Sequence, residues 1–113
     1  IGSWFRRWVG PRFEKNEWFK EQEPLSCSIE PVITWIGHAT FLIQIGGINI
    51  LTDPLFVSPS LFFRRILPPG IPLKKLPCID ALVISHNHPD HMSASCLRVI
   101  KKMQPRVLVP EKL

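Results

Sequence analysis

The sequence holds few cysteines and no long apolar segment, and both shortages exclude classes of protein. The three cysteines are Cys27, Cys78 and Cys96, and no two of them form a C-x-x-C pair. An odd number without that spacing argues against a disulfide framework and against a structural zinc site built on thiolates, so reduced thiols in a cytoplasmic protein are expected. No apolar run approaches the roughly 20 residues that a membrane-spanning helix requires.

Runs of lysine and arginine are missing as well. The net charge is +5 over 113 residues, but the basic residues are scattered along the chain. No aromatic stacking platform is interleaved with them, so a nucleic-acid partner is not expected and nuclease activity is kept only as an alternative. Apolar residues make up 45% and charged residues 20% of the sequence, a composition typical of one globular domain.

The chain divides near residue 30 into an arm and a domain. Residues 1–30 mix aromatic with charged side chains, most densely at residues 4–8. We predict an arm that packs onto the domain, with Pro11 in the first turn of a short helix. Peripheral contact with a membrane is the alternative, because Trp, Phe and Arg together suit a membrane surface. Residues 61–67 again pair apolar side chains, two of them phenylalanine, with two arginines.

From residue 31 onward the pattern is that of strands. Residues 32–36, 40–45 and 48–52 are rich in β-branched and aromatic side chains, and two glycines at 46–47 suit a tight hairpin turn. These features predict an antiparallel meander. Residues 55–77 carry repeated prolines, which exclude a long helix there.

A second unit follows the proline-rich stretch. Residues 79–84 are apolar apart from Asp80 and show no alternation, which predicts a strand that is covered on both faces. Ser93 is a suitable N-cap for a helix over residues 94–104. Residues 106–109 then predict another buried strand, so the unit is a strand, loop, helix and strand of an α/β fold.

Three of the four histidines lie in the loop after the strand at 79–84, together with an aspartate. Alternate residues of an extended backbone point the same way, so His86 and His88 can bind one ion. Asp90 and His91 can address a second ion. A solvated turn or a capped helix start would explain one histidine, but not this cluster at the end of a buried strand.

The side chains of this loop define the expected metal chemistry. Nitrogen and oxygen ligands without thiolate favour zinc, with iron or manganese as alternatives. Zinc lowers the pKa of a bound water to about 7 and so provides hydroxide at neutral pH. Asp90 could both bind metal and orient that nucleophile. The loop therefore predicts a metal-dependent hydrolase.

The pattern H-x-H-x-D-H at residues 86–91 resembles the signature of the metallo-β-lactamase superfamily. Residues 34–40, 50–54 and 79–86 resemble the branch that contains N-acylphosphatidylethanolamine phospholipase D and the ascorbate-6-phosphate lactonases. The likeness covers residues 31–113. It implies a mixed α/β fold, a four-layer αββα sandwich, of which this chain would be about the N-terminal half.

The resemblance also implies roles for single residues. His86 and His88 would bind the first zinc, and Asp90 and His91 the second. Asp53 would lie beneath the metal loop and accept a ring N–H from a ligand histidine, although a strand-ending Asp-Pro turn explains it equally well.

His38 resembles a family residue near the mouth of the site. A half-buried histidine in a hairpin is the alternative, so we do not predict it as a ligand.

No histidine follows His91, whereas the family completes its site with a later histidine, a bridging aspartate and a last histidine. We therefore expect the remaining half of the fold to be needed, and the chain alone to bind zinc weakly and to turn over nothing. For the whole protein the resemblance implies a zinc hydrolase of a phosphodiester or phospholipid. Alternatives are a lactonase or carboxylic ester hydrolase of a small phosphorylated substrate, a nuclease, or an inactive half-domain with a structural role.

Overall fold

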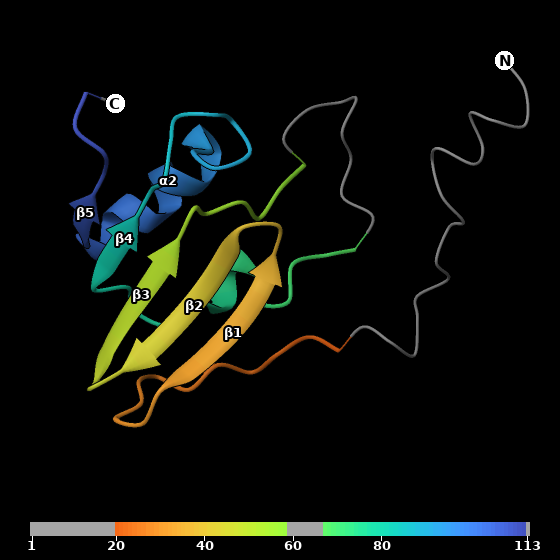
Figure 1. Cartoon of the computed structure of the whole chain (residues 1–113). Coiled ribbons are helices and arrows are strands. Elements are labelled where there is room, and N and C mark those ends of the chain that lie inside the picture. The colour runs from red at the N-terminus through yellow and green to blue at the C-terminus, as the bar shows by residue number, and fades with distance from the viewer. Residues whose placement is uncertain (1–19, 59–66, 113) are drawn as a thin grey trace, which may run out of the picture.

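A mixed β-sheet organises the computed structural model, which describes residues 20–58 and 67–112 (Figure 1). Its neighbouring strands pair antiparallel from β1 to β3 and parallel from β3 to β5. In spatial order the strands are β1 (Val32–Gly37), β2 (Thr40–Ile45), β3 (Ile48–Thr52), β4 (Ala81–Val83) and β5 (Arg106–Leu108).

The predicted antiparallel meander is confirmed. Gly46 and Gly47 join β2 to β3 with φ values of 60° and 79°, a conformation that glycine adopts at little cost. This turn sets the register in which Ile45 pairs with Ile48 and Leu42 pairs with Leu51. Because directly paired residues share a face, the register decides which side chains enter the core.

The segment before β1 is held to the hairpin by two buried side-chain amides. Gln44 donates to the carbonyl of Leu25 at 2.8 Å, and Asn49 donates to the carbonyl of Ser26 at 2.7 Å. These bonds satisfy polar groups that would be costly to bury unpaired. The described end of the arm thus lies against the sheet.

Most of the predicted arm lies outside the described residues, and so does most of the aromatic and basic stretch at 61–67. The part of the arm outside the described residues includes the aromatic and basic cluster at residues 4–8 and the helix predicted at Pro11. Within the described ranges, no helix has the length and apolar content needed to cross a bilayer.

The α-helix that follows the histidine loop is shorter than predicted. α2 covers Ala94–Ile100, and a 3-10 turn, η2 (Lys101–Met103), completes the segment predicted as helix. Gln104 ends it in the left-handed region at φ 52°, just before Pro105. Ser93 occupies the N-cap position, but its hydroxyl lies 3.1 Å from that of Ser95 and makes no capping bond.

One face of the sheet carries the core. Leu42, Leu51 and Leu82 project from three adjacent strands and are almost fully buried. They pack in one cluster with the buried side of α2 and with the loops on that face, including the 3-10 turn η1 (Leu73–Lys75). The loop and helix members of this cluster include Ile71, Leu76, Ile79, Cys96 and Ile100.

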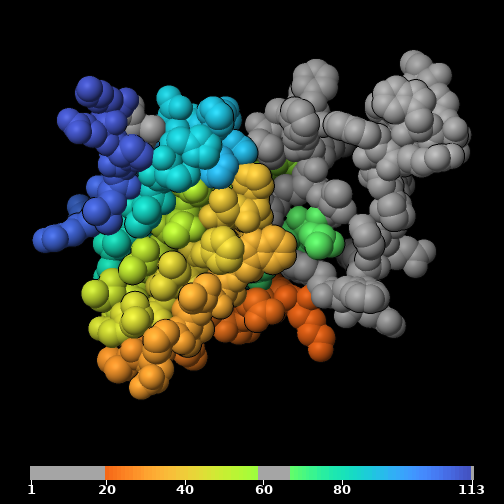
Figure 2. All heavy atoms as spheres, viewed as in Figure 1, coloured from red at the N-terminus to blue at the C-terminus, as the bar shows by residue number. Residues whose placement is uncertain are grey.

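The opposite face is apolar and exposed among the described residues. Trp35 is 60% exposed, and Val83 and Leu108 pair on the same face at 36% and 56%. Figure 2 shows atoms of β1, β2 and β3 at the surface there. The prediction that β4 is covered on both faces and that β5 is buried is therefore wrong for this part of the chain, because nothing described packs on that face or on the outer edge of β5.

Candidate metal centre

The predicted site residues meet at one edge of the sheet. β1 and β3 run the same way because each is antiparallel to β2, and β4 is parallel to β3. The carboxyl ends of these three strands therefore lie at a common edge, where α/β proteins usually bind ligands. His38 follows β1, Asp53 follows β3, and the histidine loop follows β4.

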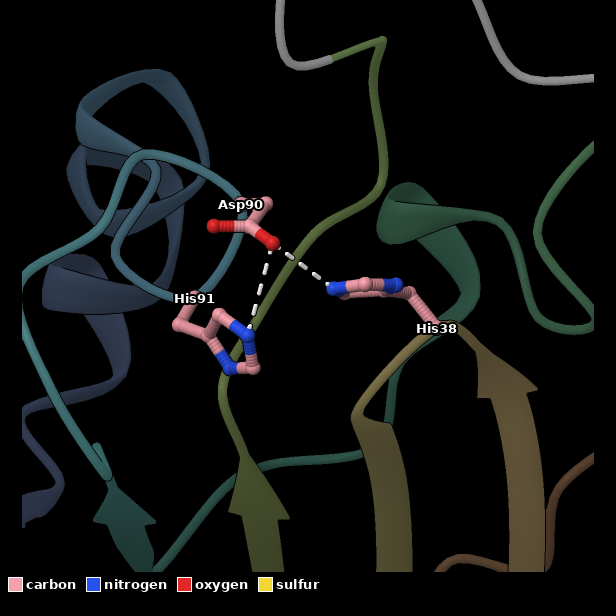
Figure 3. A group of neighbouring side chains, drawn as sticks. All are labelled: His38, Asp90 and His91. Carbon is pink, nitrogen blue, oxygen red and sulfur yellow. Dashed lines mark hydrogen bonds and ion pairs between the residues drawn. The ribbon is translucent and has the colours of Figure 1, made fainter. Parts of the chain in front are cut away.

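The turn between β1 and β2 aims His38 at the loop. A register irregularity separates Trp35 from Gly37, and His38 has a φ of 50°, which is uncommon for a residue with a side chain. The indole N–H of Trp35 donates to the carbonyl of His38 at 3.0 Å and helps to hold this turn. His38 Nε2 lies 2.9 Å from Asp90 Oδ2, as Figure 3 shows.

The histidine loop folds back on itself through one tight turn. The carbonyl of His88 accepts the backbone N–H groups of His91 at 2.9 Å and Met92 at 2.8 Å. This turn returns His91 toward His86, and their ring centroids are 3.9 Å apart. The rings of His86 and His88 lie 4.6 Å apart, as expected if alternate residues point to one side.

Two groups of metal-ligating atoms result, and Asp90 belongs to both. His86, His88 and Asp90 form one group, and His38, Asp90 and His91 form the other, with the ligand atoms of each group within 4.8 Å of one another. Imidazole and carboxylate ligands fit zinc, iron or manganese. The donor set therefore suits the metal ions that the sequence predicted, while the assignment of each ligand stays a prediction.

Asp90 contacts histidines from two different segments. Its Oδ2 lies 3.4 Å from His91 Nε2 as well as 2.9 Å from His38 Nε2 (Figure 3). Desolvation alone would raise the pKa of Asp90, but the His38 hydrogen bond, a backbone N–H and the nearby imidazoles together lower it. At neutral pH the group is thus a carboxylate, the form that binds cations.

Asp53 lies beneath the loop, where the sequence prediction placed it. Its Oδ1 accepts the backbone N–H of Ser85 at 2.7 Å, and its Oδ2 accepts the Ser85 hydroxyl at 2.7 Å and Nδ1–H of His91 at 2.9 Å. Burial alone would raise the pKa of Asp53, but these bonds, led by that of His91, lower it. The carboxylate stays ionised and holds one predicted ligand by direct contact.

Two residues of the site were missed from the sequence. Ser85 contacts both Asp53 and His86, and its place directly before the first histidine was the available signal. Thr40 donates to the carbonyl of Asp53 at 2.7 Å and accepts the N–H of Leu55 at 3.0 Å, which fixes the turn after β3. Hydroxyl contacts of this kind depend on strand pairing and have no periodic pattern.

The family model for the β-lactamase superfamily domain matches residues 32–112. The chain belongs to the β-lactamase superfamily. The predicted family and its mixed α/β fold are confirmed, and the five-stranded sheet is the part of that fold described here.

Several curated proteins are similar to this chain. N-acyl-phosphatidylethanolamine-hydrolyzing phospholipase D 1 of Caenorhabditis elegans is 35% identical over 79 residues, which are 66% of this chain and 22% of that protein. A UPF0173 metal-dependent hydrolase of Anaeromyxobacter sp. (strain K) is 35% identical over 71 residues, 62% of this chain and 24% of that protein. The chain therefore spans less than a quarter of the length of these curated relatives.

A solved structure shares the fold of this chain. The crystal structure of CmlA, a diiron β-hydroxylase from Streptomyces venezuelae, matches with a TM-score of 0.57 and 33% sequence identity. The match covers 75% of this chain and 16% of that protein. The proteins similar to this chain thus include a phospholipase D, a metal-dependent hydrolase and a diiron β-hydroxylase.

Proposed function

We propose that the protein carrying this chain is a zinc-dependent hydrolase that cleaves the phosphodiester bond of a phospholipid. The observation that carries the proposal is the position of Asp90, which lies within 4.8 Å of two sets of imidazoles, His86 with His88 and His38 with His91. Two nitrogen and oxygen sites joined by one carboxylate suit an adjacent pair of ions. When bound, such ions lower the pKa of a coordinated water and stabilise negative charge on a phosphate oxygen.

The residues of this chain would have different roles at the site. His86 and His88 would hold the first ion and His91 the second, with Asp90 between them. Asp90 would also orient the attacking water. His38 donates its Nε2–H to Asp90 in this arrangement, so we assign it to holding that carboxylate and not to ligation.

Further ligands from outside residues 1–113 belong to the proposal. A catalytic zinc ion normally has three protein ligands and one open position. With His38 engaged by Asp90, the described residues offer the second ion only Asp90 and His91. The rest of the superfamily fold is accordingly the partner that this chain requires.

The substrate class is supported by the phospholipase D relative, which the chain resembles at 35% identity. An N-acyl phosphatidylethanolamine would be split by water at the phosphorus–oxygen bond to the headgroup, giving a phosphatidic acid and an N-acylethanolamine. A lipid substrate would also give a role to the aromatic and basic residues of the arm. A soluble phosphorylated lactone is the alternative within the hydrolases.

A diiron oxygenase is the second candidate, because the solved neighbour CmlA is a diiron β-hydroxylase. The same imidazole and carboxylate groups suit iron. The two candidates differ in co-substrate: a hydrolase needs only water, whereas a hydroxylase needs dioxygen and electrons. Turnover under strict exclusion of oxygen separates them.

The test is metal analysis and lipid hydrolysis with the natural polypeptide that carries residues 1–113. We expect close to two zinc ions per chain, and release of phosphatidic acid from vesicles containing an N-acyl phospholipid without oxygen. Asp90→Asn should lose at least about 100-fold in rate, since it removes the shared carboxylate.

Asp80→Asn is the matched control, because among the described residues the Asp80 side chain accepts only the backbone N–H of Asn49, at 2.8 Å, away from the histidines. Its rate should equal that of the wild type. A metal-loaded protein that leaves the N-acyl phospholipid intact would overturn the substrate assignment. A protein that takes up no stoichiometric metal would overturn the whole proposal.

A further inference from the structure

Ser85 joins a predicted metal ligand to the buried carboxylate. Its Oγ lies 2.7 Å from Asp53 Oδ2 and 2.8 Å from His86 Nδ1. Its backbone N–H donates to Asp53 Oδ1 at 2.7 Å. The serine is thus fixed by both its main chain and its side chain, directly beside His86.

The two contacts of this hydroxyl determine where the protons lie. A serine hydroxyl has one proton, and an ionised carboxylate only accepts hydrogen bonds. The proton of Ser85 must therefore point to Asp53, since otherwise two oxygens with lone pairs would face each other at 2.7 Å. The hydroxyl oxygen then accepts from His86, so Nδ1 of His86 carries a proton.

The same carboxylate acts directly on His91. Asp53 Oδ2 accepts from Nδ1 of His91 at 2.9 Å. In each neutral imidazole only one nitrogen carries a proton, so Nε2 of both histidines keeps its lone pair. That nitrogen is the one available to an ion in both cases.

We infer that Ser85 is a positioning residue that fixes the tautomer and ring orientation of His86 and links it to the carboxylate that also fixes His91. The inference rests on the proposed function only in taking His86 and His91 as ligands. One buried aspartate thereby prepares one histidine from each of the two ligand groups, directly for His91 and through a hydroxyl for His86.

A hydrogen-bonded relay runs from Asp53 through Ser85 to His86. The backbone around Asp53 keeps this relay in place. Asp53 has a φ of 33°, which costs energy for a residue with a side chain and needs support from its surroundings. Thr40 provides support through its hydrogen bond to the Asp53 carbonyl, and the Asp53 N–H donates to Val83 at 2.9 Å. The backbone of Asp53 is therefore tied to both β2 and β4 without any ion.

The experiment combines two measurements on the natural polypeptide that carries this chain. Two-bond ¹H–¹⁵N spectra of the metal-free protein report which ring nitrogen of His86 is protonated. Competition titration with a chromophoric chelator reports zinc affinity. The variants are Ser85→Ala, which removes the hydroxyl, and Ser85→Thr, which keeps it.

Ser93→Ala is the matched control, because the hydroxyl of Ser93 is also near the loop but contacts only Ser95 in the described residues. For the wild type we expect the Nδ1–H tautomer of His86. Ser85→Ala should shift His86 toward the Nε2–H form and weaken zinc binding about 10–100-fold, the usual effect of losing such a partner. Ser85→Thr and Ser93→Ala should retain both properties.

Three results would overturn the inference. The first is an Nε2–H tautomer of His86 in the wild-type protein, which needs no variant to fold. The second is an unchanged tautomer in Ser85→Ala, even with weaker zinc binding, since that describes a merely structural serine. The third is a failure of Ser85→Thr to restore the Nδ1–H form. If the wild type shows the expected tautomer but binds no zinc, the relay stands and the proposed hydrolase fails.

Discussion

Replacing Asp53 with asparagine removes one negative charge beneath the histidine loop and keeps the size of the side chain. The wild-type carboxylate accepts three hydrogen bonds, from the N–H and hydroxyl of Ser85 and from His91. Asparagine offers one accepting oxygen, and its amide nitrogen must face at least one of these donors. We expect Asp53→Asn to weaken both the metal-free fold and metal binding.

The magnitude follows from how the bonds divide between the two oxygens. Oδ2 accepts two of them and Oδ1 one, so either orientation of the amide loses one or two. A hydrogen bond to a charged group contributes roughly 1.5–3 kcal/mol. The Asp53 side chain is only 9% exposed, so water cannot replace the lost acceptor. The free energy of unfolding should fall by about 2–5 kcal/mol, and metal affinity by about 10–100-fold.

The pKa of Asp53 provides a second signature. Burial would raise it, but the bonds from His91 and Ser85 lower it below its ordinary value. A group with a lower pKa in the folded state stabilises the fold above its unfolded pKa, and this stabilisation is lost as the pH falls through the folded pKa. The stability difference between wild type and variant should therefore be largest at neutral pH and shrink in acid.

Urea unfolding of the metal-free protein, followed by tryptophan fluorescence over a pH series, measures this difference. Asp80→Asn is again the control, because an asparagine oxygen can still accept the N–H of Asn49 that the Asp80 side chain binds. Equal unfolding free energies for wild type and Asp53→Asn at about pH 7 would refute the reasoning. A stability difference that grows in acid would refute it as well.

Three further predictions concern other parts of the structure. His38→Ala should weaken metal binding by roughly 10-fold in a chelator competition, because Asp90 loses its partner at 2.9 Å; unchanged affinity would contradict the holding role. Gly70→Ala should lower the free energy of unfolding by about 1–3 kcal/mol, since a Cβ there would lie 2.8 Å from the Trp35 carbonyl oxygen; a wild-type urea midpoint would count against it. Chelation of metal should lower the thermal midpoint, because saturation at about 100 times Kd adds about 2.7 kcal/mol; no shift would show that ions do not bind the folded state.

Local sequence patterns predicted much of the fold. The glycine pair at 46–47 and the β-branched runs on either side specified the hairpin, because turn conformation and side-chain alternation are local properties. Ser93 was correctly placed at the start of α2, and Pro105 follows the end of η2. What failed was the burial of β5, since a continuous apolar run does not reveal which of its faces the described chain covers.

Local sequence likewise predicted only part of the site. The histidine loop was evident because its residues are neighbours in sequence. The contact between His38 and Asp90 was not, because it depends on β1 running parallel to β3 and on a left-handed residue in the β1–β2 turn. The role of Ser85 was missed for a related reason. Ser85 and His91 share Asp53 as a hydrogen-bond partner, and the pairing of β3 with β4 brings these residues together.

The parallel pairing of β3 with β4 also has a consequence for the order of folding. Short turns join β1 to β2 and β2 to β3, whereas residues 53–80 must close as a loop before β4 can pair. Closure costs more entropy for a longer loop, so the hairpins should form first and β3–β4 pairing later. Asp53 ends one of these strands and Ser85 and His86 follow the other, so the relay assembles only at that late step. A bound ion would then mainly slow unfolding and would leave the rate of folding nearly unchanged.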